Sequence, residues 1–451
     1  MKNNVKYLLL AVAIASVTGC GLLKKYNNEA KAPENLAGID EVVERTIGES
    51  SIGDISWRDL FCDQLLLDLI DTALVRNVDV NSARLVVKQA DEALKAAKLS
   101  FIPTLSFNPS YSYDGGHSYS LPFSINWNTP GFGSRTNSLR EANALALQAA
   151  DNEEAVRSMI VAQVAKTYLE LQSLDRQLEI LDQTCEVWQQ VCDTQRALME
   201  NGKAYSPSVN QLEASLVGVR IQRVDTEEHL RDVEYALCLL LAETPRKVAR
   251  NPIGSFNVPD AISIGVPAAL LEKRPDVRSA AREVEAAYYA EKISLAAMFP
   301  SISLTGMLGW TNGGVKITDP IQMIYNAVAS LAQPIFAGGQ LRAKYKISQF
   351  QREDAANRYA QAILKAGNEV NAALRECKNA AGKEAMYQSQ VAMLQDAYDA
   401  TAELMKNGKA AYVEVLMAQN SLLEAQLSME LNRLSGRTSL INLYIALGGG
   451  V

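Results

Sequence analysis

Leu198-Met199-Glu200-Asn201-Gly202-Lys203-Ala204 returns later in the chain as Leu404-Met405-Lys406-Asn407-Gly408-Lys409-Ala410. In each copy an apolar-periodic segment runs into Asn-Gly, where glycine accepts the left-handed conformation that ends a helix. A second helical segment starts a few residues later in both copies. Each copy is therefore predicted to be a long helical hairpin.

Other fragments recur in the same order as this pair. Residues 77–80 correspond to 274–277, residues 101–103 to 298–300, and residues 130–132 to 334–336. One short match arises by chance, but four matches in one order with slowly drifting spacing indicate a duplication with small insertions. We therefore expect two structural repeats: residues 58–257, with strands at about 101–132 and a hairpin at about 138–242, and residues 258–451, with strands at about 299–336 and a hairpin at about 340–447.

The N-terminus has the pattern of a secreted lipoprotein. Lys2 and Lys6 precede an apolar run over residues 8–17, which is too short to span a bilayer, so residues 1–19 are predicted to be a signal peptide. The small residues before Cys20 resemble a lipobox, in which the cysteine is acylated on sulfur and becomes the mature N-terminus. An ordinary cysteine beside a plain cleavage site is the alternative. Residues 20–57 are then an acylated N-terminal segment.

The first hairpin carries a coiled-coil pattern. Apolar positions alternate by three and four from Val164 to Met199, and the return segment from Leu212 to Leu240 keeps this period less cleanly. Ser206 is expected to cap the return helix, with Pro207 in its first turn. The seam of the second hairpin is richer in small residues, which let helix backbones approach closely: Ala362, Ala366, Val370, Ala373, Cys377 and Ala381.

Between the helical blocks the period changes to two. Every odd residue from Tyr119 to Trp127 is apolar or aromatic, and the segment from Leu105 to Tyr113 alternates in the same sense. Alternating segments of about ten residues with aromatic ends suit a transmembrane barrel wall, although the edge of a soluble sandwich is equally compatible with them. About eight strands are the fewest that enclose a filled interior, so four strands span a membrane only if several chains contribute.

Composition and motifs argue against nucleic-acid binding and catalysis. The formal net charge is −7, so no basic excess points to nucleic acid. The cysteines form no CxxC pair and only two histidines accompany them, so no metal or cofactor site is expected. His117 and His229 lack a convincing nucleophile setting, and no Walker-type nucleotide loop is present. The chain is predicted not to be an enzyme.

Three further stretches carry a family resemblance: residues 264–278, which contain Arg274-Pro275-Asp276, residues 299–306, which begin Phe-Pro-Ser-Ile, and residues 334–339. Together with the lipobox and the two Asn-Gly-Lys turns, they resemble the outer-membrane efflux protein family, the TolC-like ducts. The resemblance is strongest to the lipoprotein branch that serves resistance-nodulation-division pumps, and it covers almost the whole mature chain. Residues 274–276 also have the chemistry of a helix start, with proline and an acid in the first turn.

The resemblance implies a mixed α/β membrane protein. In this family a homotrimer forms one twelve-stranded transmembrane β-barrel, with four strands per protomer, in the outer membrane. Long coiled-coil hairpins continue the barrel as a periplasmic α-helical barrel. Short helices near residues 59–75 and 266–273 would belong to a belt around that tunnel. The implied partners are outer-membrane lipid, a periplasmic adaptor (membrane fusion) protein and an inner-membrane resistance-nodulation-division pump.

The family also implies candidate sites at the periplasmic tip. Its hairpin turns contact the adaptor, although Asn-Gly also simply ends a helix, so partner contact is an expectation. Many relatives carry an acid after the second turn that narrows the closed mouth; the matching position here is Met417, and Glu414 lies one turn earlier. The expected adaptor contacts are Asn201, Gly202, Lys203, Ala204, Tyr205, Asn407, Gly408, Lys409, Ala410 and Ala411.

The expected function is passive conduction of small molecules across the outer membrane as part of a tripartite efflux pump, with multidrug resistance as one outcome. The alternatives are the outer-membrane duct of an ATP-driven export system and a coiled-coil periplasmic scaffold lipoprotein. A scaffold does not explain why alternating strands recur at matching places in both halves. The sequence leaves the cargo open.

Overall fold

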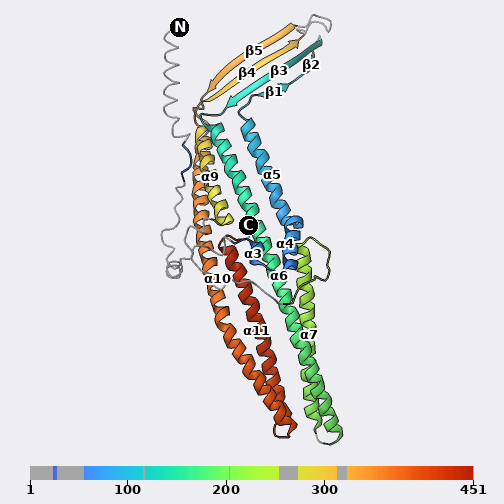
Figure 1. Cartoon of the computed structure of the whole chain (residues 1–451). Helices are drawn as coiled ribbons and strands as arrows, with labels where there is room; N and C mark the ends of the chain where they lie inside the picture. Colours follow the sequence, from blue (N-terminus) through green and yellow to red (C-terminus); the bar gives the residue numbers. More distant parts are fainter. Residues whose placement is uncertain are drawn as a thin grey trace. The chain divides into compact units, whose positions relative to one another are not determined.

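The computed structural model describes residues 24–27, 55–114, 117–202, 204–252, 273–311 and 322–449 (Figure 1). Cys20, Lys203, the predicted signal peptide and almost all of the expected short helix at 266–273 lie outside the described residues. The chain divides into two compact units. One contains Arg84–Asn152, Asp276–Ile363 and the N-terminal residues 24–27, and the other contains the described parts of Asn35–Ala83, Glu153–Pro275 and Leu364–Val451.

The first unit contains an antiparallel sheet. Its strands are β1 (Thr104–Phe107), β2 (Ser110–Tyr113), β3 (His117–Thr129), β4 (Ser301–Thr311) and β5 (Gln322–Ala332). The order is β1-β3-β4-β5, and β2 also pairs with β3, so β1 and β2 lie along the same side of β3. The alternating segments of both sequence halves are therefore strands of one sheet, as Figure 1 shows.

Close approach between β3 and β4 explains one glycine in the sheet. Gly309 lies opposite Pro122 in the register, and a Cβ at Gly309 would come within 2.6 Å of Pro122 Cα. No larger residue fits there without moving the backbone. The facing pair Phe107 and Phe123 stacks with ring centroids 4.7 Å apart, which adds a cross-strand contact to the β1–β3 ladder.

The helices are α3 (Trp57–Leu60), α4 (Gln64–Arg76), α5 (Val78–Leu99), α6 (Ser134–Glu200), α7 (Ser206–Leu240), α9 (Pro275–Ala296), α10 (Gln340–Lys406) and α11 (Tyr412–Ala446). Helix α6 and helix α10 each have 67 residues, and α7 and α11 each have 35. The predicted helix start at residues 274–276 is confirmed, because α9 begins at Pro275 with Asp276 in its first turn.

Short polar side chains set several helix starts, as capping requires. Asp63 Oδ1 accepts from the Leu65 N–H at 3.0 Å at the start of α4, and Asn77 Oδ1 accepts from the Asp79 N–H at 2.8 Å at the start of α5. The expectation that Ser206 caps α7 is wrong. The helix already includes Ser206, and Tyr205 occupies the cap position without a side-chain hydrogen bond.

The coiled-coil seam of the first hairpin forms the core of the second unit. Its buried residues include Leu181, Trp188 and Cys192 of α6, together with Leu212 and Leu216 of α7. Leu416 and Leu423 of α11 join the same cluster, so the two hairpins share one apolar core. In the second hairpin Ala366, Val370 and Ala373 are buried as expected, but Ala380 is buried in place of Ala381.

No helix in the described part of the chain has an apolar stretch long enough to cross a membrane.

Candidate functional site

The turn between α6 and α7 closes by backbone hydrogen bonds around a left-handed glycine. Gly202 has φ +71° and its N–H donates to the Met199 carbonyl at 2.9 Å. The side chain of Asn201 turns back, and its Nδ2 donates to the Ala197 carbonyl at 2.7 Å. These bonds satisfy carbonyls that the end of a helix otherwise leaves without partners.

The turn between α10 and α11 is built in the same way. Gly408 also has φ +71°, its N–H donates to the Met405 carbonyl at 2.9 Å, and Asn407 Nδ2 donates to the Glu403 carbonyl at 2.9 Å. Lys409 adds a backbone bond to Leu404. The prediction that Asn-Gly ends each helix is therefore confirmed at both positions.

Both turns leave an open surface. Apart from each glycine and its two chain neighbours, no described atom lies within 4 Å of the position that a Cβ would occupy at Gly202 or Gly408. Tyr205, which follows the first turn, is 82 % exposed, and Lys409 is exposed on the second. Figure 1 places the two turns at the same end of the second unit. A partner could therefore contact residues of both turns together.

The two candidate gate residues lie on the exposed side of α11. Met417 is 64 % exposed and Glu414, three residues earlier, is exposed as well. Residues three apart are neighbours on a helix surface, so the thioether and the carboxylate share one face. Val415, Leu416 and Gln419 are buried on the opposite face and fix the rotation of the helix.

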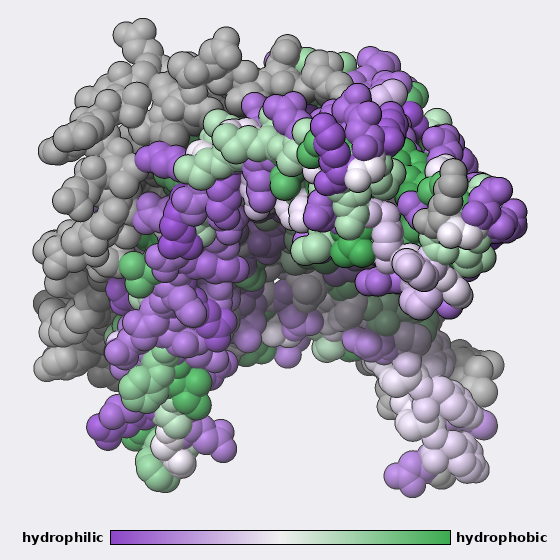
Figure 2. All heavy atoms as spheres, turned by 90° about the horizontal axis from the view of Figure 1, so that it is seen from below, coloured by the Kyte–Doolittle hydropathy of each residue, from purple (hydrophilic) through white to green (hydrophobic). Residues whose placement is uncertain are grey.

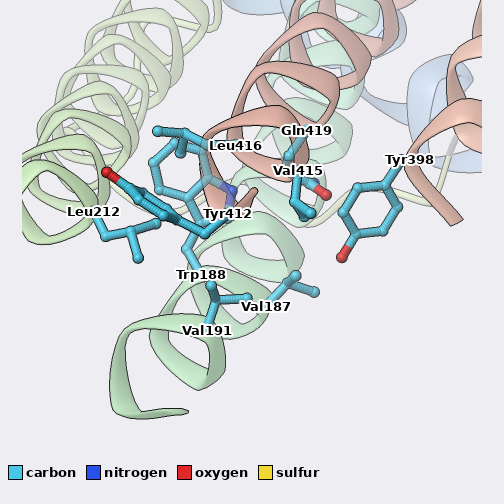
Figure 3. Close-up of a pocket in the computed structure, with 9 residues that line it drawn as sticks. All are labelled: Val187, Trp188, Val191, Leu212, Tyr398, Tyr412, Val415, Leu416 and Gln419. Carbon is cyan, nitrogen blue, oxygen red and sulfur yellow. The ribbon is translucent and has the colours of Figure 1, made fainter. Parts of the chain in front are cut away.

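A small apolar pocket lies behind that face, in the second unit. Its lining comes from four helices: Val187, Trp188 and Val191 of α6, Leu212 of α7, Tyr398 of α10, and Tyr412, Val415, Leu416 and Gln419 of α11. Figure 3 shows the rings of Trp188 and Tyr412 gathered with Leu212 and Leu416, while Tyr398 approaches Val415 and Gln419. Tyr412 Oη also donates to Gln211 Oε1 at 3.4 Å. No periodicity in the sequence indicates this junction, because its members come from both hairpins.

Two polar groups in this junction are strongly influenced by burial. Gln419 Oε1 is buried and has no hydrogen-bond partner in the part of the chain that the structure describes. Burial, followed by the nearby charge of Asp399, raises the pKa of the Tyr398 hydroxyl. Tyr398 is therefore neutral at physiological pH and acts as an apolar ring with a polar tip.

Ion pairs and polar contacts run along the first hairpin outside its core. Arg220 Nη2 donates to Gln189 Oε1 at 2.8 Å, and Arg196 pairs with Glu213 across α6 and α7. The groups of the second pair are about half exposed, so solvent screens their attraction and the pair adds little stability. The face of the molecule in Figure 2 is mostly hydrophilic, with hydrophobic residues in separate patches. Because these surface pairs add little, the two helices of the hairpin are held together by their buried apolar residues.

The described residues offer little for covalent or metal chemistry. They contain no group of three or more His, Cys, Asp and Glu side chains that could hold a metal ion. Burial raises the pKa of the Cys185 and Cys192 thiols, which keeps them protonated and weakly nucleophilic. His117 Nδ1 lies 2.6 Å from Tyr111 Oη within the sheet, and His229 Nε2 lies 3.4 Å from the Glu170 carboxylate.

Comparison with known proteins identifies related sequences along nearly the whole chain. The family model for "Outer membrane efflux protein" matches residues 69–243 and 266–449. The cation efflux system protein CusC of Escherichia coli K12 is 26% identical over 458 residues, which cover 99% of this chain and 99% of that protein. The pyoverdine export outer membrane protein OpmQ of Pseudomonas aeruginosa is 26% identical over 470 residues, covering 99% and 97%.

Solved structures share the fold. The outer-membrane channel OprN superposes with a TM-score of 0.83 at 19% identity, covering 94% of this chain and 98% of that chain. CusC gives a TM-score of 0.77 at 24% identity, covering 88% and 95%. The open state of the Neisseria gonorrhoeae MtrE outer membrane channel gives 0.80 at 21% identity, covering 95% and 97%. The fold is that of the TolC-like outer-membrane channels.

Proposed function

Because the chain belongs to the outer membrane efflux protein family, we propose that it is the outer-membrane channel of a tripartite efflux pump. It conducts small molecules passively, and an inner-membrane resistance-nodulation-division pump supplies the energy through a periplasmic adaptor. The observation that carries this proposal is the pair of hairpins of equal helix lengths, each ending in an exposed turn around a glycine with φ +71°.

The sheet supports a barrel assembled from three copies. In one chain both outer strands, β5 and the β1–β2 pair, leave an edge without a partner among the described strands. Unpaired edges invite association, and closing a barrel removes them. Three chains with four strand positions each would give the twelve strands of the family's barrel. Apolar side chains on both outer strands share one face of the sheet and are exposed in the single chain, as lipid-facing residues would be: Leu105, Tyr111, Met323, Tyr325 and Leu331.

The proposal includes an internal duplication and a lipid anchor. The repeats are residues 58–257 and 258–451, and the equal lengths of α6 and α10, and of α7 and α11, favour a common origin. Residues 1–19 are removed as a signal peptide, Cys20 is acylated, and residues 20–57 form the anchored segment. The helices then occupy the periplasm and the strands the outer membrane.

The two exposed turns are the proposed adaptor contacts. They comprise Asn201, Gly202, Lys203, Ala204 and Tyr205 of the first turn, and Asn407, Gly408, Lys409, Ala410 and Ala411 of the second. Glu414 and Met417 follow the second turn on an exposed face and are the proposed gate. An adaptor that binds the open arrangement more tightly shifts the channel toward it, as any ligand-driven switch requires.

The cargo differs among the relatives. Three relatives are named for the efflux or export of cations, pyoverdine and toluene. We propose that the inner-membrane pump selects the cargo of this channel.

In-cell photo-crosslinking tests the proposal. Tyr205 is the position for the crosslinking amino acid, because its side chain is far more exposed than that of Tyr412, which packs against Trp188 and Leu212. The control position is Val78, an exposed residue at the start of α5. Capture of an adaptor encoded beside a proton-driven pump at Tyr205, and not at Val78, supports the efflux channel. Capture of an adaptor of an ATP-driven transporter favours secretion, and self-crosslinks alone contradict both.

A further inference from the structure

A short N-terminal segment, residues 24–27, lies against helix α9 in the first unit. The backbone N–H of Tyr26 donates to Tyr289 Oη at 3.3 Å. The hydroxyl of Tyr288 donates to the Lys24 carbonyl at 3.4 Å. Two consecutive tyrosines of α9 thus hold two backbone positions of a segment that precedes them by more than 260 residues.

Ring contacts reinforce these two hydrogen bonds. The ring centroids of Tyr26 and Tyr288 are 5.4 Å apart, and those of Tyr288 and Tyr289 are also 5.4 Å apart with an edge-on geometry. Aromatic pairs at 4.5–7 Å contribute about 0.5–1.5 kcal/mol beyond the area that they bury. Tyr288 and Tyr289 are only 6 % and 4 % exposed. The segment therefore meets a buried aromatic surface.

Charged side chains from neighbouring helices hold this surface in place. Arg352 of α10 lies 5.1 Å from the Tyr288 ring and Lys292 of α9 lies 5.0 Å from it, both within the range of cation–π attraction. Arg352 also donates to the buried carboxylate of Glu291 at 3.0 Å. Because α9 and α10 both contribute, the aromatic surface exists only where these helices are packed.

The contact of residues 24–27 with α9 limits how far an anchor at Cys20 can lie from the first unit. Lys24 is four residues after Cys20, so an extended chain spans at most about 14 Å between them. The next described residue is Ile55, whose carbonyl accepts from Tyr444 Oη at 2.8 Å. A chain of 35 residues between Cys20 and Ile55 could extend to about 120 Å. The contact at Tyr26 therefore lowers the maximum distance of Cys20 from the nearest described contact roughly ninefold, from about 120 Å to about 14 Å.

The same contact lies close to the strands. Tyr289 is seven residues before the end of α9 at Ala296, about 10 Å along the helix axis, and β4 begins at Ser301. The extended chain from Lys24 to Cys20, at most about 14 Å, is long enough to cover the distance of about 10 Å from Tyr289 to the end of α9. Acyl chains on Cys20 could thus enter the membrane beside the ends of the strands that the membrane surrounds.

We propose that Tyr288 and Tyr289 form a docking site for Lys24–Asn27, and that this site places the lipid anchor at the base of the strands. We name the site the tyrosine clasp: Tyr26 with Tyr288 and Tyr289. The occupant is this chain's own segment, and the role of the clasp in placing the anchor rests on the proposed acylation of Cys20. The clasp fixes the anchor to the folded first unit, so that anchor and strands enter the membrane at one place.

Photo-crosslinking of the full-length protein in the outer membrane of a Gram-negative host tests the clasp. p-Benzoylphenylalanine replaces Lys24, whose side chain is exposed, and mass spectrometry maps the adducts. The expected adducts lie on α9, around Tyr288 and Tyr289. Tyr26→Ala and Tyr288→Leu should each lower the yield of these adducts about fivefold, whereas Tyr235→Leu, at a half-exposed tyrosine of α7, should leave it unchanged.

Two outcomes overturn the clasp. One is the absence of α9 adducts in the otherwise unaltered chain, and the other is an unchanged yield in Tyr26→Ala. The second variant keeps the test decisive if Tyr288→Leu fails to fold, because Tyr26 lies in the segment itself and outside the buried helix surface.

A separate measurement distinguishes the clasp from the acylation on which it builds. Labelling with an alkyne analogue of palmitate, with Cys20→Ser as control, reports acylation alone. Labelled protein without α9 adducts overturns the clasp and leaves the proposed anchor intact. Adducts without labelling overturn the proposed acylation, and with it the anchor-placing role of the clasp.

Discussion

Arg250 donates to the carboxylate of Glu234 at 2.5 Å, and both side chains are 7 % exposed. A second contact of 2.8 Å joins Arg250 to Asp175 of α6. The Glu234 carboxylate also accepts from the Val248 N–H at 3.4 Å. This network ties the segment that follows α7 to both helices of the first hairpin, α6 through Asp175 and α7 through Glu234.

Replacing Arg250 with methionine should strongly destabilise the second unit. The substitution retains an apolar stem but leaves Glu234 buried without its counter-charge, which typically costs about 3–5 kcal/mol. Urea unfolding in detergent, followed by tryptophan fluorescence, measures the loss. The control is Arg231→Met, since Arg231 is exposed and its ion pair among the described residues is with Glu227, one turn away; its effect should stay below about 0.5 kcal/mol. Equal effects of the two variants would contradict the structural role of the buried pair.

Acid should weaken the second hairpin through Glu384. Burial alone would raise the pKa of this carboxyl, but hydrogen bonds from Arg433 and Gln388, at 2.9 Å each, lower it overall. A carboxyl whose folded pKa is depressed contributes stability above its unfolded pKa, near 4.5, and loses it as the pH falls through the folded value. The stability difference between the unaltered chain and Glu384→Gln should therefore be largest at neutral pH and shrink below about pH 4. A difference that is constant from pH 7 to pH 3 would exclude this linkage.

Gly408→Val should impair the proposed transport while leaving the proposed trimer assembled. The φ of +71° costs an ordinary residue roughly 1–2 kcal/mol and a β-branched one more, although there is open space for the side chain itself. Gly382→Val is the matched control, because Gly382 lies within helix α10, has a negative φ and also faces open space. Drug susceptibility of cells reports transport, and native gel electrophoresis reports assembly. Normal efflux in Gly408→Val would remove the case for a functional tip at this turn.

Local sequence signals predicted the parts of the fold that depend on neighbouring residues. Asn-Gly located both turns, the heptad pattern located the buried face around Leu181 and Trp188, and alternation located the strands. Pairing over long distances has no such signal. Tyr26 contacts Tyr289 of α9 although the two residues are 263 apart in the sequence. The hydrophobic periodicity of neither segment indicates this contact.

The proposed gate residues, Glu414 and Met417, show the same limit of sequence-based prediction. Their exposed face could be inferred from the heptads, since Val415 and Leu416 belong to the apolar seam. The pocket behind that face, with the unpartnered Gln419 Oε1, depends on four helices that meet in three dimensions. The Ser206 cap failed for a different reason: Pro207 suits the first turn, but the helix starts one residue earlier than the pattern indicated.

Truncating Leu416 should loosen the attachment of α11 to the first hairpin. Leu416 is buried in the cluster that contains Trp188 and Leu212, and Leu→Ala at such sites costs about 2–5 kcal/mol. Hydrogen exchange should rise in residues 412–420, whereas Leu431→Ala, at an exposed position of the same helix, should not change it. If both variants exchange alike, the shared apolar core does not hold α11 in place.

Met417 and Glu414 should affect conduction in different ways. Both side chains lie on the exposed face of α11, but Met417 carries an uncharged thioether and Glu414 an acidic group. Three copies of Met417 around a closed mouth would narrow it by volume, so Met417→Ala should raise single-channel conductance in planar bilayers severalfold. Three copies of Glu414 would attract cations, so Glu414→Gln should lower the preference for cations and change the conductance little. Met386→Ala, at an exposed methionine of α10, is the control and should change neither property. A larger conductance change in Glu414→Gln than in Met417→Ala would assign the gate to the carboxylate.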